Sequence, residues 1–119
     1  MMNVIRDMPA HILAIHASGT ITEDDYKNVL IPETEKQLSQ DEKISMLFVL
    51  DGLSHFNFAA MWEDTKYGVK HWTQFRKIAL VTDEKWVSDM TRLFIPFFPG
   101  EVKLYPMNEL EDAKEWLVL

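Results

Sequence analysis

The stretch that decides the fold is Ile44–Gly52, which reads ISMLFVLDG. Its nearly unbroken apolar run ends at Asp51-Gly52, and such a run is typical of a strand buried on both faces of a parallel sheet covered by helices. A second run of this kind, Ile78–Val81, is closed by Thr82-Asp83, and Val102–Tyr105 reads as a short strand. The sequence therefore predicts parallel strands at the centre of the molecule.

The chain before this stretch predicts a hairpin followed by a helix. Asn3–Asp7 is broken at Met8-Pro9-Ala10, and His11–Ala17 is a run of β-branched and small residues flanked by Gly19, so reversal at Pro9 is the simplest interpretation. Thr22 is then an expected N-cap whose hydroxyl accepts from the N–H three residues on. Pro32 should kink the helix that follows, because it has no N–H to donate.

The chain after this stretch alternates helical patterns with the later strands. Apolar residues recur at helical spacing between Phe58 and Trp72, and again between Trp86 and Phe97. A last helix is expected after Asn108 as its cap, with its apolar residues facing inward. The resulting order, β-β-α-β-α-β-α-β-α, predicts an α/β fold with a mixed, mostly parallel sheet covered by helices.

Length and charge restrict the class of protein. The 119 residues predict one domain spanning 1–119, and the chain has no cysteine for thiolate chemistry, clusters or Cys-ligated zinc. A net charge of −7 opposes nucleic-acid binding and adsorption to anionic lipid. Residues 1–8 are too polar and short for a signal peptide, and no apolar stretch is long enough to cross a bilayer. We expect a soluble, cytoplasmic protein without nucleic-acid partners.

Several short motifs follow one another along the chain in a characteristic order and spacing. They are Gly19-Thr20-Ile21-Thr22, Asp25-Tyr26, Pro32, Trp62-Glu63-Asp64, the segment from Phe75 to Val81, Trp86, and Glu109–Leu117 with Ala113 and Trp116-Leu117. In these motifs the chain is similar to the STAS fold of sulfate transporters and anti-sigma-factor antagonists, and it resembles the SpoIIAA-like branch over nearly its whole length.

The resemblance has different implications for its two branches. Anti-sigma antagonists carry a phosphorylatable serine in an Asp-Ser-Ser-Gly segment at a helix start, where this chain has Ala59 and Ala60. Phosphorylation chemistry is therefore not transferred, and Ser54 is expected in the preceding strand-to-helix loop. The SpoIIAA-like branch implies a non-catalytic module that binds apolar ligands or membrane surfaces, with a fold that looks like the core of lipid-carrying CRAL-TRIO domains.

Residue patterns for catalysis, metals and cofactors are weak. The four histidines lack the spacing that focuses two imidazoles on one ion, so we expect no metal site. Asp51, Ser54 and His55 supply the residue types of a hydrolytic triad, but the nucleophile-elbow pattern is absent, and Asp51 and Ser54 are more simply explained as turn residues. No phosphate-binding glycine pattern is present, so no cofactor is expected.

The strongest functional signal is the apolar excess of residues 86–99. A stripe of Met90, Leu93, Phe94 and Phe97 can pack on the sheet, which leaves at least one of Ile95 and Phe98 toward solvent or a cavity. Pro96 should end or bend this helix, which makes the segment a candidate lid. Candidate ligand- or membrane-contact residues are Trp62, Trp86, Met90, Leu93, Phe94, Ile95, Phe97 and Phe98.

Three functions remain open from the sequence. The first is a module that binds lipid or another hydrophobic small molecule, or attaches peripherally to a membrane, through the mobile helix near residues 86–99. The second is a regulatory protein-interaction module that docks a partner through the loop that contains Gly52, Ser54, Ala59 and Ala60. The third is a hydrolase that uses Ser54 and His55. Ordinary core packing with a homodimer contact is the alternative explanation of the apolar segment.

Overall fold

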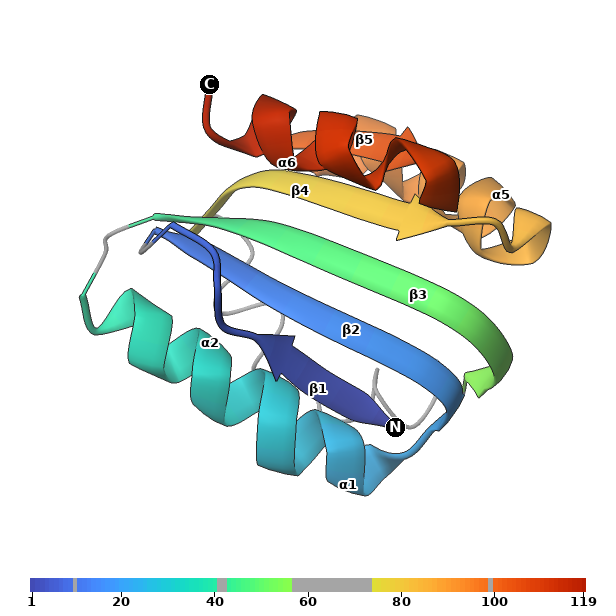
Figure 1. Ribbon diagram of the computed structural model, residues 1–119, viewed down its shortest axis with the longest axis horizontal. Coiled ribbons are helices and arrows are strands. Elements are labelled where there is room, and N and C mark those ends of the chain that lie inside the picture. The colour runs from blue at the N-terminus through green and yellow to red at the C-terminus, as the bar shows by residue number, and fades with distance from the viewer. Residues whose placement is uncertain (10, 41–42, 57–73, 99) are drawn as a thin grey trace.

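The protein is built on a five-stranded sheet whose spatial order, β1-β2-β3-β4-β5, follows the chain (Figure 1). The computed structural model describes residues 1–9, 11–40, 43–56, 74–98 and 100–119. The strands are β1 (Met2–Ile5), β2 (Ile12–Ile21), β3 (Ile44–Phe56), β4 (Phe75–Thr82) and β5 (Glu101–Tyr105). The predicted helix between Phe58 and Trp72 lies outside the described residues.

The strand directions confirm the predicted mixed sheet. β1 and β2 form an antiparallel pair, whereas β2, β3, β4 and β5 are parallel to one another. The decisive run Ile44–Leu50 forms the first half of β3 and is almost entirely buried, because it has a paired strand on each side and helices on both faces. The order and directions of these elements confirm the predicted α/β fold.

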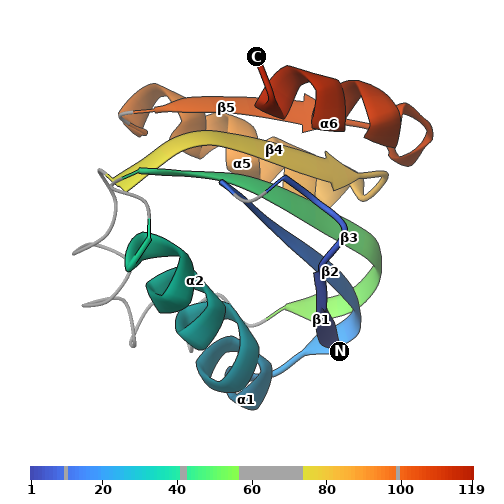
Figure 2. The ribbon, with the colours of Figure 1, turned by 60° about the vertical axis from the view of Figure 1, so that its left-hand side comes forward.

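Two helices on opposite sides of the sheet divide the core in two (Figure 2). One core lies on the side of α2 (Ile31–Leu38), where Val29, Leu30 and Leu38 pack on the sheet. The other lies under α6 (Leu110–Leu117), whose Ala113, Trp116 and Leu117 are buried, in agreement with the expected inward-facing apolar residues. A further helix, α5 (Lys85–Phe94), follows the carboxyl end of β4.

The first helical region begins as predicted, with Thr22 as its cap. The Thr22 hydroxyl accepts from the Asp25 N–H at 3.2 Å, and the Asp25 carboxylate accepts from the Thr22 N–H at 3.1 Å. The short α1 (Glu23–Asp25) continues into a π-helical segment, η1 (Tyr26–Leu30), before α2 begins. Pro32 lies in the first turn of α2, so the wider π turn accommodates the missing proline donor.

β3 is longer than the sequence predicted. Asp51-Gly52 was expected to end the strand, but β3 continues to Phe56 and stays paired with Ser18–Ile21 of β2. Gly19 and Gly52 both have a positive φ, of 63° and 64°, and the register shifts beside Gly19. The Asp-Gly signal therefore marks an irregularity inside the strand instead of a turn, because glycine adopts this conformation without steric cost. Ser54 lies in β3 and not in a loop.

The start of the last helix also differs from its prediction. Asn108 lies in a 3₁₀ turn, η4 (Met107–Glu109), and α6 begins at Leu110 without a side-chain cap. The Asp83 carboxylate, at the end of β4, accepts from the Met107 N–H at 2.9 Å. The polar group that accepts from this turn thus comes from a distant part of the chain. The prediction of Asn108 as the cap considered only neighbouring residues and therefore missed it.

Candidate functional site

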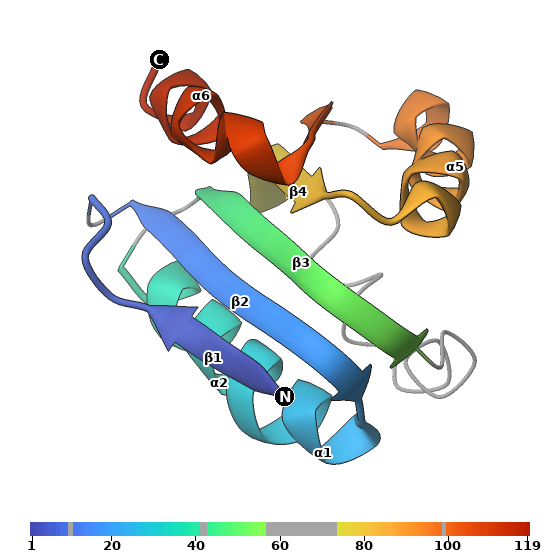
Figure 3. The same cartoon turned by 45° about the vertical axis from the view of Figure 1, so that its right-hand side comes forward.

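The predicted lid residues form α5 and a 3₁₀ turn, η3 (Ile95–Phe97), at the end of the sheet (Figure 3). α5 ends at Phe94, two residues before Pro96, which confirms that this proline ends or bends the helix. Ile95 and Phe98 are half-buried. The Phe98 N–H donates to the Ile95 carbonyl at 3.2 Å, which closes the turn.

The burial of α5 is centred on Val87, which is 4% exposed, and this corrects the predicted stripe. Leu93 lies six residues after Val87, about 240° around the helix, and it is therefore turned away from the core. Its side chain is 73% exposed, so the expectation that Leu93 packs on the sheet was wrong. At least one large side chain does face solvent, as predicted, but it is Leu93 and not Ile95 or Phe98.

The exposed side of α5 carries an apolar patch, defined here as Trp86, Met90 and Leu93. These residues lie at positions i, i+4 and i+7, so they share one face of the helix. Trp86 is 37% exposed and Met90 is half-buried. Beside the patch, the Arg92 guanidinium and the Asp89 carboxylate lie 3.4 Å apart, and Lys85 is also exposed. The patch is thus an apolar surface bordered by charges of both signs.

The predicted partner-docking residues fall in two groups. Gly52 is exposed in β3, and Ser54 lies further along the same strand. Ala59, Ala60 and Trp62 lie outside the described residues. Ser54 lies within β3, so it does not stand on the strand-to-helix elbow that carries the nucleophile of α/β hydrolases.

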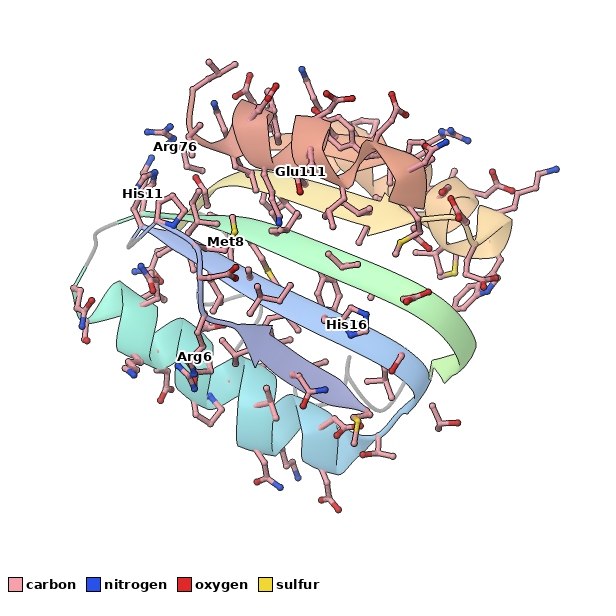
Figure 4. All side chains as sticks on the ribbon, viewed as in Figure 1. Arg6, Met8, His11, His16, Arg76 and Glu111 are labelled. Atoms are coloured by element: carbon pink, nitrogen blue, oxygen red, sulfur yellow. The ribbon has the colours of Figure 1, made fainter. Side chains whose placement is uncertain are left out.

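A histidine of β2 and an aspartate of β3 lie next to each other on the surface of the sheet. The His16 Nε2 atom of β2 lies 3.5 Å from an Asp51 carboxylate oxygen of β3, and Figure 4 labels His16 on this face. The sequence interpretation gave Asp51 a turn role, but its strand position brings it next to the imidazole. Both side chains are open to solvent, with exposures of 35% and 57%, so this is a solvent-exposed contact and not a buried acid–base dyad.

Two lysines lie against the indole of Trp116 on the α6 side. The Lys77 ammonium is 5.1 Å from the ring centroid and donates to the Trp116 carbonyl at 3.3 Å, while the Lys103 ammonium is 4.9 Å from the same centroid. The buried Lys77 therefore places a positive charge at the carboxyl end of α6, where the helix dipole favours it. Burial raises the pKa of the neighbouring Tyr105, and the carboxylates of Asp112 and Glu109 raise it further.

Two hollows between β1 and α2 were not expected from the sequence. Their volumes are about 180 Å³ and about 330 Å³, and both are lined by Val4, Arg6 and Glu33. Trp86 lines neither of them, so they are separate from the expected lid. No sequence signal pointed to them, because the pairing of a short edge strand with a helix is a property of the tertiary fold.

The described ranges contain no group of three or more His, Asp or Glu side chains that is placed to hold a metal ion. None of the helices seen in those ranges has the length and apolar character needed to span a bilayer. The fold and these surfaces define a small α/β module with an open apolar patch.

Comparison with known proteins assigns the family. The SpoIIAA-like family model matches residues 12–118, and the chain therefore belongs to the SpoIIAA-like family. The structure is similar to the crystal structure of an uncharacterized protein of the DUF3478 family, with a SpoIIAA-like fold, from Shewanella loihica PV-4. The two share 29% sequence identity and a TM-score of 0.75 over 98% of this chain and 92% of that one. No curated protein matches the chain. The fold fits a small non-enzymatic module.

Proposed function

We propose that this protein is a non-enzymatic module that attaches peripherally to membranes through the apolar patch of α5. The observation that carries the proposal is the 73% exposure of Leu93 beside the partly exposed Trp86. Apolar side chains on one face of a short helix are suited to shallow insertion into the interface, and tryptophan prefers that depth.

Charge determines which lipids this surface should prefer. The chain has a net charge of −7, and the charged side chains Lys85, Asp89 and Arg92 beside the patch are of mixed sign. Attraction to anionic headgroups is therefore weak, and apolar burial must supply the binding free energy. We expect binding to neutral phosphatidylcholine vesicles, little gain from phosphatidylserine and little dependence on salt.

Vesicle flotation tests this function. Wild-type protein should float with phosphatidylcholine vesicles, and Leu93→Ser should reduce the floating fraction severalfold because it removes the most exposed apolar side chain of α5. Val118→Ser is the matched control, since Val118 is also an exposed apolar residue, 52% exposed, but follows α6. Circular dichroism should show that both variants keep the wild-type fold.

Three results would contradict the proposal. The protein could remain unbound with either vesicle type, it could float only with anionic vesicles, or Val118→Ser could reduce binding as much as Leu93→Ser.

A wild-type dimer that Leu93→Ser converts to a monomer in sedimentation experiments would assign the patch to self-association instead. An apolar ligand that co-purifies with wild type but not with Leu93→Ser, detected by mass spectrometry, would point to ligand binding by the same segment.

A second function, a regulatory protein-interaction module, is supported by the exposed Asp51 and Gly52 near the carboxyl ends of β2 and β3. Loops and strand ends at this edge of a parallel sheet are common positions for recognition. If this surface docks a partner, a protein recovered stoichiometrically with wild type should be lost with Asp51→Arg and retained with Leu93→Ser. The opposite pattern would exclude Asp51 from the docking surface.

A further inference from the structure

β1 and β5, the two edge strands of the sheet, differ in how they are protected. β5 carries the exposed charged residues Glu101 and Lys103, and charges of this kind discourage the pairing of another strand. β1 contains no charged residue, and within the described ranges its outer edge pairs with no strand. The N–H and C=O groups of that edge are thus placed to pair with an added strand.

A groove runs beside this unprotected edge. It consists of the two hollows between β1 and α2, which share Val4, Arg6 and Glu33. The smaller hollow lies toward the carboxyl ends of both elements, where Met8 and Gln40 line it, and the larger one lies beside Asn28 of η1. Figure 3 shows β1 at the margin of the sheet with the helical region alongside it.

An ion pair lies between the two hollows. The Arg6 guanidinium is 3.1 Å from a Glu33 carboxylate oxygen, and Figure 4 shows Arg6 reaching from the end of β1 toward α2. Met2 and Val4, at alternate positions of β1, belong to the core on the α2 side. A strand added outside β1 would likewise direct alternate side chains toward α2, one toward each hollow.

The charge of the groove indicates the chemistry of its occupant. The positive charge of Arg6 is compensated by its ion pair with Glu33. Lys36, which lines the smaller hollow, is exposed and forms no ion pair with a described residue. The smaller hollow therefore presents an uncompensated ammonium group in a chain with a net charge of −7. A carboxylate is the complementary group.

We propose that β1 and α2 form a docking groove for an extended, acidic segment of a partner protein, which adds to the sheet as an antiparallel strand. An antiparallel partner begins at the carboxyl end of β1, so its acidic residue comes first and lies opposite Lys36. Two apolar residues follow at alternate positions and enter the hollows. Main-chain pairing supplies affinity and the alternate side chains supply specificity. This groove is distinct from the patch on α5, and the two proposals stand independently.

A displayed library of random octapeptides tests the groove. The selected peptides should contain an Asp or Glu followed by apolar residues two and four positions later. Lys36→Glu should weaken binding of a selected peptide by about five- to tenfold, because an attraction becomes a repulsion. Replacement of the peptide's acidic residue by lysine should restore binding to the Lys36→Glu variant. Lys103→Glu, on the opposite edge strand, is the matched control and should leave binding unchanged.

Backbone N-methylation separates strand addition from simple charge attraction. Methyl groups on peptide amides that face β1 should abolish binding, whereas methyl groups on the alternate amides, which face away, should be tolerated. In a heteronuclear NMR titration with the unmodified peptide, the amides of Met2 and Val4, which face away from β2, should shift together with those on α2. This readout does not depend on membrane binding.

The proposal is overturned by any of the following results. The library could yield no peptide that distinguishes wild type from Lys36→Glu, methylation could have the same effect at every position, or the shifted amides could lie outside β1 and α2. Concentration-dependent shifts of the β1 amides without peptide would show that a second copy of the chain pairs at this edge.

Discussion

Gly19 and Gly52 place the same left-handed backbone conformation on two adjacent strands, beside the carboxyl ends of β2 and β3. No described atom lies within 4 Å of a Cβ built on either residue, so space does not require glycine there. The positive φ does, because an L side chain is strained in that region. Single residues thus explain why two long parallel strands bend together without separating.

Gly52→Ala should destabilise the protein by about 1–2 kcal/mol. The alanine side chain is strained in the left-handed backbone conformation, and it gains no contact that would offset this strain. Gly52→Asn should cost less, since asparagine tolerates this conformation better. Urea unfolding of both variants and wild type measures the difference. Equal stability of wild type and Gly52→Ala would show that the positive φ does not constrain this position.

The Thr22 cap gives a second prediction. Thr22→Ala removes the acceptor for the Asp25 N–H and should lower the free energy of unfolding by about 1 kcal/mol. Ser39→Ala, at the far end of the same helical region, is the control, because its exposed hydroxyl donates to the Lys36 carbonyl and caps no N–H group in the described residues. The result would contradict the capping role if both substitutions changed the urea midpoint equally.

Tyr105 gives a prediction for alkaline pH. Its pKa is raised in the folded state, so folding holds the phenol proton more tightly than the unfolded chain does. The resulting stabilisation is fully present below the ordinary tyrosine pKa of about 10 and is lost as pH rises through the raised pKa. Urea midpoints from about pH 8 to pH 11 should therefore fall more steeply for wild type than for Tyr105→Phe. Parallel curves would contradict the prediction.

The elements show what the sequence could and could not specify. The buried runs at Ile44–Leu50 and Ile78–Val81 correctly predicted β3 and β4, because apolar continuity is a local signal. The extension of β3 beyond Gly52 was missed because a glycine irregularity and a turn share the same Asp-Gly signal. The orientation of α5 was also missed, since Val87 fixes its rotation only through contact with the sheet.

Among the site residues, sequence reasoning located the apolar segment but not the direction in which each side chain faces. The spacing of Trp86, Met90 and Leu93 correctly placed them on one side of a helix, and tertiary contacts turned that side outward. The hollows beside β1 and the contact between His16 and Asp51 depend on residues brought together by pairing between strands. A single sequence carries no local signal for such pairs.

The two sides of α5 should respond differently to substitution. Val87→Ala removes buried methyl groups and should destabilise the protein by about 1–3 kcal/mol. Leu93→Ser should change stability by no more than about 0.5 kcal/mol, because Leu93 is mostly exposed in the folded state. Thermal and urea unfolding of both variants measures this contrast. A large loss with Leu93→Ser would show that this side of α5 is covered.

At the scale of the whole molecule, the two proposed binding surfaces occupy separate parts of one small fold. The helix α5, which carries the patch, follows the carboxyl end of β4, whereas β1, which lines the groove, lies at the other margin of the sheet (Figures 1 and 3). The intervening strands are strongly buried and separate the two surfaces. Substitutions on one surface should therefore leave binding at the other unchanged, which double variants with Lys36→Glu and Leu93→Ser would measure.

The strand order has a consequence for biosynthesis. Since every strand pairs with the one translated just before it, a nascent chain can assemble its sheet from one side to the other while still attached to the ribosome. We expect stalled translation intermediates of increasing length to gain protease resistance in steps, one for each strand that emerges. Resistance that appears only at full length would show that assembly waits for release.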